Sequence, residues 1–120
     1  MQLEIQSFSY DERSGVLPEL LAKLADGGGW IVERRTTSPS TVKMSVEVQL
    51  RSIVELYSAL IGAGLELTRS SHLMLTDLCT CRLNAADAVD LGQIVTMQLE
   101  ISFLEDITLH SLLASGVSPA

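Results

Sequence analysis

The chain contains few aromatic and few basic residues, and both shortages limit what it can do. One Trp, two Tyr and two Phe are spread over 120 residues, so aliphatic side chains must build most of the core. Eight Lys and Arg residues face fifteen Asp and Glu residues, which gives a formal net charge of −7. The only adjacent basic pair is Arg34-Arg35. A nucleic-acid partner requires a clustered cationic face, so the composition argues against one.

The sequence also has no long apolar run, and its first residues do not resemble a signal peptide. No apolar stretch approaches the roughly 18 residues that a membrane-spanning helix needs. The first six residues alternate and include an acid, Glu4, where a signal peptide would carry positive charge and then an apolar run. We therefore expect a cytoplasmic protein that does not contact a membrane.

Cysteine is scarce as well, since Cys79 and Cys81 are the only two. If both lie on one strand, their Cα atoms are ~6.6 Å apart, near the upper limit for a disulfide. We expect two reduced thiols, in agreement with a cytoplasmic setting.

Hydrophobic spacing predicts a strand at about residues 2–9 and then a helix from Ser14. Apolar residues recur there at intervals of three and four, which places one stripe on a helix: Val16, Leu17, Leu20, Leu21 and Leu24. Ser14 is the expected N-cap, and Pro18 falls in the first turn or just beyond it. The glycines at 27–29 are expected to end the helix.

The same plan then recurs. A strand is expected at 30–37, a turn at 38–40, and a third strand with strict alternation from 41 to 50. A second helix begins at about Ser52 and ends at Gly62-Ala63-Gly64. A fourth strand begins at 65–68 and continues, bends or bulges towards Leu83. Leu24 and Leu60, each just before a glycine stop, are 36 positions apart.

Two strand–helix–strand units predict an α+β protein of ferredoxin-like βαββαβ type, with helices on one face of an antiparallel sheet. We expect one domain over 1–120, with a core at 1–82 and an extension at 83–120. The extension is expected to add a strand at about 93–104, which would cover a sheet edge if it lies beside the fourth strand. A short helix at about 106–114 follows.

The first unit resembles the opening strand, loop and helix of an ACT domain. The pattern is an acid, a short turn, a glycine followed by an aliphatic residue and Leu, a helix, and a glycine-containing turn into the next strand. The matching residues are Asp11, Gly15, Val16, Leu17, Leu21, Leu24, Gly28 and Ile31. The proline that is common before the glycine is replaced by Ser14, and residues 83–120 lie outside the resemblance.

The resemblance implies a small-molecule effector, with an amino acid as the first ligand class, bound between this loop and a partner subunit of a homodimer. It implies five contact residues: Asp11, Ser14, Gly15, Val16 and Leu17. Free N–H groups at the helix start favour an anionic group there, and a glycine lets a ligand approach the backbone closely. The alternative is that Gly15 only shapes a tight turn.

The sequence contains no strong motif for catalysis, metal binding or cofactor binding. Gly62-Ala63-Gly64 follows a helix rather than a strand and is a helix stop, not a dinucleotide fingerprint. On a strand, Asp77, Cys79 and Cys81 share one side, where the thiols pack into the core. Asp77 then either sits at a bulge that turns it outwards or has a partner such as Arg69 or Arg82.

His72 lies on the opposite side of that expected strand, and His110 is expected at a surface or interface. We therefore expect no catalytic residue, no metal and no cofactor. The preferred function is a non-enzymatic regulatory or small-molecule-binding module. The alternative is a structural or protein-interaction protein without a ligand, and an enzyme ranks third.

Overall fold

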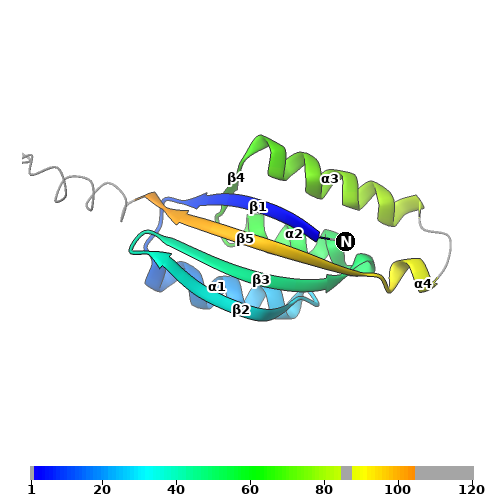
Figure 1. Cartoon of the computed structure of the whole chain (residues 1–120), viewed down its shortest axis with the longest axis horizontal. Coiled ribbons are helices and arrows are strands. Elements are labelled where there is room, and N and C mark those ends of the chain that lie inside the picture. The colour runs from blue at the N-terminus through cyan, green and yellow to red at the C-terminus, as the bar shows by residue number, and fades with distance from the viewer. Residues whose placement is uncertain (1, 85–87, 105–120) are drawn as a thin grey trace, which may run out of the picture.

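The computed structural model describes residues 2–84 and 88–104, which form an α+β arrangement with one five-stranded sheet (Figure 1). The strands are β1 (Gln2–Ser9), β2 (Trp30–Ser38), β3 (Thr41–Gln49), β4 (Glu66–Leu67) and β5 (Ile94–Phe103). The helices are α1 (Arg13–Asp26), α2 (Ile53–Gly62), α3 (Arg69–Asn84) and the short α4 (Ala88–Leu91), with a 3-10 turn η1 (Leu50–Ser52). The helix expected at about 106–114 and His110 lie outside the described residues.

The order of the strands is β2-β3-β5-β1-β4, so β5 occupies the centre of the sheet. It runs antiparallel to β3 and parallel to β1. The expected antiparallel sheet is therefore a mixed one, and its order is not the predicted ferredoxin-like order. The suggestion that the added strand lies beside the fourth strand is also wrong. β4 has two residues, so it cannot satisfy the backbone of a ten-residue strand, whereas β1 and β3 pair along it.

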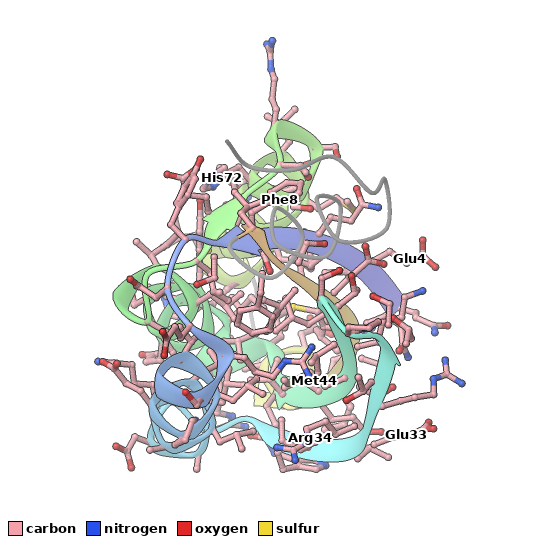
Figure 2. All side chains as sticks on the ribbon, turned by 90° about the vertical axis from the view of Figure 1, so that its left-hand side faces the viewer. Glu4, Phe8, Glu33, Arg34, Met44 and His72 are labelled. Atoms are coloured by element: carbon pink, nitrogen blue, oxygen red, sulfur yellow. The ribbon has the colours of Figure 1, made fainter. Side chains whose placement is uncertain are left out.

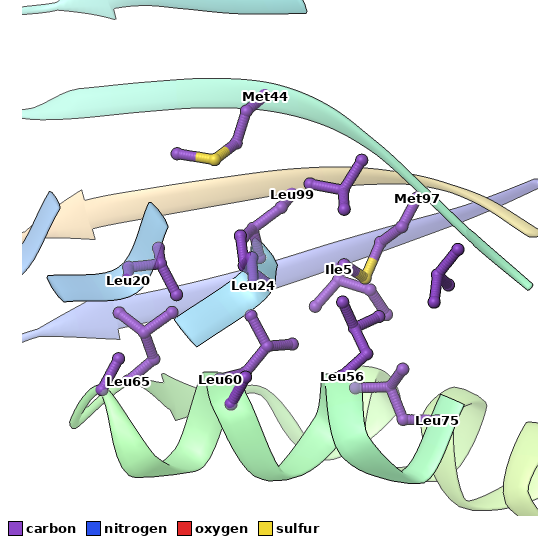
Figure 3. Close-up of a cluster of buried hydrophobic side chains, with 14 of the residues drawn as sticks. Ile5, Leu20, Leu24, Met44, Leu56, Leu60, Leu65, Leu75, Met97 and Leu99 are labelled. Carbon is purple, nitrogen blue, oxygen red and sulfur yellow. The ribbon is translucent and has the colours of Figure 1, made fainter. Parts of the chain in front are cut away.

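Alternation along β3 and β5 places every second side chain in a single core (Figure 3). From these two strands the buried side chains are Val42, Met44, Val46, Val48, Val95, Met97, Leu99, Ile101 and Phe103. The helices close the core from one side, chiefly with Val16, Leu20, Leu24, Ile53, Leu56 and Leu60. The opposite side of the sheet carries polar residues and faces away from α1 and α2 (Figure 1).

Both predicted glycine stops are confirmed. Gly28 after α1 and Gly64 after α2 have the same φ of +85°, a conformation that glycine adopts without steric cost. The residue after each glycine donates its backbone N–H back into the helix, to the carbonyl of Leu24 at 2.9 Å and of Leu60 at 3.3 Å. This is the Schellman arrangement, and Leu24 and Leu60, which are 36 positions apart, occupy the same position in it.

The largest error of the sequence prediction concerns residues 69–84, which form α3 rather than a continued strand. Thr68 starts the helix: its side-chain oxygen accepts the backbone N–H of Ser71 at 3.3 Å. The buried side of α3 is formed by Ser71, Leu75 and Leu78, at helical spacing. Leu73 and Leu83, whose alternation with Leu75 suggested a strand, are 55% and 75% exposed.

Ser71 also contacts the edge of β1 at a point that the short strand β4 does not reach. Its Oγ accepts the backbone N–H of Gln6 at 2.8 Å, while the N–H of Thr68 donates to the Gln6 carbonyl at 3.1 Å. Ser71 is 1% exposed, so the acceptor of this hydrogen bond is shielded from water. The start of α3 thus satisfies a strand edge that the two-residue β4 leaves open.

We expect Ser71→Ala to destabilise the protein by about 1–3 kcal/mol, because it removes the acceptor of the part-buried Gln6 N–H. The matched control is Ser70→Ala, at a neighbouring exposed position, which we expect to change the free energy of unfolding by less than about 0.5 kcal/mol. Urea unfolding of both variants measures the difference. Equal stability of the two variants would contradict the role of Ser71.

Candidate functional site

The loop predicted to bind a ligand leads directly into α1, which begins at Arg13 with Glu12 as its N-cap. The carbonyl of Glu12 accepts the backbone N–H groups of Gly15 and Val16, both at 3.1 Å. The sequence predicted Ser14 as the N-cap, and this prediction is wrong. Ser14 lies inside the first turn of α1. The helix starts earlier because Glu12 already has extended backbone angles and supplies the first carbonyl.

The five predicted contact residues divide into exposed and buried ones. Asp11, Ser14 and Gly15 are exposed, and the backbone N–H of Asp11 donates to Ser9 Oγ at 3.2 Å. Val16 is 4% exposed and forms part of the core, and Leu17 is half-buried against it. Only the first three are therefore placed at the surface, because the helical period turns Val16 and Leu17 inwards.

Gly15 does not shape a tight turn, which was the alternative interpretation. In the described part of the chain only Gly28 and Gly64 have positive φ. A Cβ built on Gly15 meets no atom within 4 Å, so neither sterics nor backbone angles require glycine there.

The residues expected on the continuation of the fourth strand lie on α3, where strand alternation does not apply. Asp77 is exposed, so it needs neither a bulge nor a cation to offset burial. Arg82, one of its two suggested partners, instead donates from Nε to the carbonyl of Arg51 at 3.0 Å. Asp77 is a solvated helix residue.

The thiols and His72 do not converge either. Cys81 is exposed, while Cys79 is half-buried, and burial raises the pKa of its thiol. His72 Nδ1 forms a hydrogen bond of 2.5 Å with the Tyr57 hydroxyl and links α3 to α2. Within residues 2–84 and 88–104, no group of three or more His, Cys, Asp or Glu side chains is placed to hold a metal ion.

The face of the sheet that no helix of the described chain covers, called the uncovered face below, presents a polar surface with a shallow hollow of about 350 Å³. Residues from four strands line the hollow. The polar and charged ones, which could contact a ligand, are Glu4, Gln6, Arg35, Lys43, Gln98 and Glu100. Figure 2 shows Glu4 on the side of the sheet away from α1, together with Glu33 from β2. The alternation of β1, β3 and β5 puts these residues outside for the same reason that it puts Ile5, Met44 and Leu99 inside.

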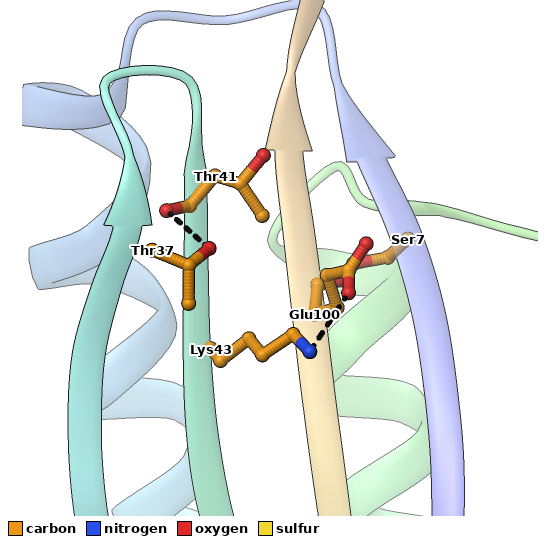
Figure 4. A network of polar contacts seen from close by, with 5 residues as sticks. All are labelled: Ser7, Thr37, Thr41, Lys43 and Glu100. Carbon is orange, nitrogen blue, oxygen red and sulfur yellow. Dashed lines mark hydrogen bonds and ion pairs between the residues drawn. The ribbon is translucent and has the colours of Figure 1, made fainter.

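Strand register arranges the charges of this face in a row. Arg35 on β2 lies opposite Lys43 on β3, which lies opposite Glu100 on β5, which lies opposite Gln6 on β1. Lys43 Nζ is 3.5 Å from Glu100 Oε2 (Figure 4). Both side chains are partly exposed, so solvent weakens this ion pair.

A second row lies beside the first and runs through Ser45, Gln98 and Glu4. Ser45 Oγ donates to Gln98 Oε1 at 2.8 Å, which orients the amide. In the described part of the chain, neither Arg35 nor Glu4 forms an ion pair. A cation at one end of the hollow and a carboxylate at the other are thus available to a ligand.

This arrangement can hold a ligand that carries charges of both signs. The hollow offers charges of both signs and amide groups, which can hold a molecule that carries a carboxylate and an ammonium group. Sequence alternation separates the polar from the apolar residues within β1, β3 and β5. It could not bring them together, because Arg35, Lys43, Glu100 and Glu4 become neighbours only when β5 enters the centre of the sheet.

No family model matches the chain, and comparison with curated proteins and with solved structures finds no similar protein. Among the described residues, no helix is both long and apolar enough to cross a membrane.

We expect Gly15→Ala to stabilise the protein by roughly 0.5–1 kcal/mol, because alanine favours the helix and its Cβ meets no neighbour. Gly28→Ala is the matched control, and we expect it to destabilise the protein. It forces a side chain into φ +85° and places Cβ 3.1 Å from Ser52 Oγ. Thermal unfolding of both variants measures the two effects, and a loss of stability in Gly15→Ala would contradict the helical placement of Gly15.

We expect Cys81 to react with a disulfide reagent faster than Cys79 at pH 8. Burial raises the pKa of Cys79, which lowers its thiolate fraction at any pH below that pKa, and it also limits access. Single variants Cys79→Ser and Cys81→Ser, labelled as a function of pH, assign the two rates. Faster labelling of the variant that retains only Cys79 would show that α3 is packed differently.

Proposed function

We propose that the protein is a non-enzymatic binding module that holds a small zwitterionic molecule, with an amino acid as the first candidate, on the uncovered face of its sheet. The observation that supports this proposal is the hollow between Arg35 and Glu4, two opposite charges that lack an ion-pair partner in the described residues. A ligand carboxylate would approach Arg35, and its ammonium group would approach Glu4. The ion pair of Lys43 and Glu100 lies between them.

The regulatory part of the proposal is a homodimer whose arrangement responds to the ligand. A ligand shifts such an equilibrium only as far as it binds one arrangement better than the other. The resemblance to an ACT domain favours a second location for the ligand, at the loop, where Asp11, Ser14 and Gly15 are exposed. The two locations predict different sensitive residues, so experiment can separate them.

The alternative function is a structural or protein-interaction protein that has no small-molecule ligand. The observation that favours it is the nine-residue strand β2, which forms an edge of the sheet. Its exposed residues include Trp30 and Val32, at 43% and 58%. Apolar side chains on a free strand edge are typical of surfaces that pair with another chain.

We expect one or more amino acids to raise the melting temperature in a thermal-shift screen. A ligand at 100 times its Kd stabilises the folded state by about 2.7 kcal/mol, which corresponds to a shift of roughly 10 °C for a domain of this size. Glu4→Gln removes the carboxylate of the hollow that has no ion-pair partner in the described chain, and it should abolish the shift. Glu47→Gln is the matched control, because Glu47 lies on the same face of β3 but does not line the hollow.

Gly15→Val is the variant that tests the loop. If it abolishes the shift while Glu4→Gln retains it, the ligand binds at the loop and not on the sheet. If no amino acid shifts the melting temperature at millimolar concentration, the binding proposal fails and the alternative function is favoured.

A further inference from the structure

The two edge strands of the sheet differ in length and in how far the backbone beside them is hydrogen-bonded. At one edge, β4 contributes only Glu66 and Leu67, and the start of α3 satisfies the adjoining backbone of β1. At the other edge, β2 runs for nine residues, and no strand of the described chain pairs with its outer side. Figure 1 shows β2 as the outermost strand at the lower side of the sheet. An edge of this length offers a row of unpaired N–H and C=O groups to another chain.

The charged residues in the middle of β2 have no ion-pair partner within the described chain. Glu33, Arg34 and Arg35 are all exposed. Glu33 lies opposite Ser45, and Arg35 lies opposite Lys43, so both belong to the uncovered polar face. Arg34 lies opposite Met44, on the helix side of the sheet. Figure 2 shows Glu33 and Arg34 pointing in different directions at this edge.

Charges and bulges commonly protect an edge strand against pairing, and β2 has both. Its register shifts fall between Ile31 and Glu33 and between Thr36 and Ser38, so residues 33–36 keep regular pairing between them. The charges in this segment have opposite signs two positions apart on one face. A pattern of this kind repels a misaligned copy and attracts a correctly aligned one.

We propose that two copies of this chain pair β2 with β2 in antiparallel orientation around a two-fold axis at Arg34. In this register Glu33 lies opposite the partner's Arg35, and symmetry repeats this contact, so two ion pairs form on the uncovered face. Val32, which is 58% exposed, lies opposite the partner's Thr36. The two sheets become one, and both helix layers lie on the same side of it.

The charges also select this register over its neighbours. A shift of the axis to Arg35 places Arg35 opposite its own copy, and a shift to Glu33 does the same for Glu33. An axis between two residues would place side chains of the uncovered face opposite side chains of the helix face. The Arg34 register has one like-charge contact, between the two copies of Arg34, against two attractive ones.

Arg35 belongs to both proposals, whereas Glu33 takes part only in the strand pairing and Glu4 only in the hollow, so variants of Glu33 and of Glu4 test the two proposals independently. The two proposals can therefore fail separately. The interface is small, so we expect a dimer with a Kd in the micromolar range, measured by sedimentation velocity over a concentration series.

Glu33→Arg and Arg35→Glu should each weaken the dimer at least tenfold, since each turns two attractive contacts into two repulsive ones. The double variant Glu33→Arg/Arg35→Glu should restore the Kd to within about threefold, because it only exchanges the two partners of each pair. An equimolar mixture of the two single variants should form a heterodimer, since all four facing charges are then opposite. Arg34→Gln should strengthen the dimer about two- to fivefold by removing the like-charge contact.

The matched controls are Glu66→Arg and Arg69→Glu, which carry the same charge changes at the opposite edge and should leave the Kd unchanged, alone or mixed. Circular dichroism verifies that every variant is folded. A wild-type chain that is monomeric at roughly 300 µM overturns the proposal. So does a wild-type dimer that Glu66→Arg weakens and Glu33→Arg does not, or a mixture of single variants that associates no better than the mixture of controls.

Discussion

The structure depends on the pairing of β5 with β1 and β3. Without this strand, β1 with β4 and β3 with β2 would form two separate ladders, because in the described chain only β5 joins them. Its five inward side chains, from Val95 to Phe103, are completely buried and sit in the middle of the core. The residues that complete the fold thus come near the end of the described chain, and about ninety residues separate the paired strands β1 and β5.

The one-sided cover of the sheet follows from the same arrangement. The helices pack against the face that carries Met44, Met97 and Leu99, and the other face retains the polar half of each alternating strand. Because β5 lies between β1 and β3, the cations of β2 and β3 face the carboxylates of β5 and β1 across a single surface. The hollow and the Lys43–Glu100 contact therefore follow from the position of β5 between β3 and β1, and the same strand order leaves β2 at an edge of the sheet.

Local patterns were reliable where one physical signal acted alone. The stripe from Val16 to Leu24 predicted α1, and the glycines at 28 and 64 marked both helix ends because only glycine adopts φ +85° without steric cost. The prediction failed for α3 because Leu73, Leu75 and Leu83 imitate strand alternation, whereas Leu73 and Leu83 are exposed in the structure. Thr68 followed by Ser71 was the available signal, since a Thr side chain can accept the N–H three residues later.

The sequence by itself determined the α+β class, the strands that alternate, the two glycine-terminated helices and the polar character of one sheet face. These features follow from side-chain period and backbone freedom, which are local properties. Only the tertiary structure decided the order of the strands, the short β4 with its Ser71–Gln6 contact, and the neighbours of Arg35, Lys43, Glu100 and Glu4. Strand order depends on which long strands can satisfy the backbone of β5, and no pattern within a single segment carries that information.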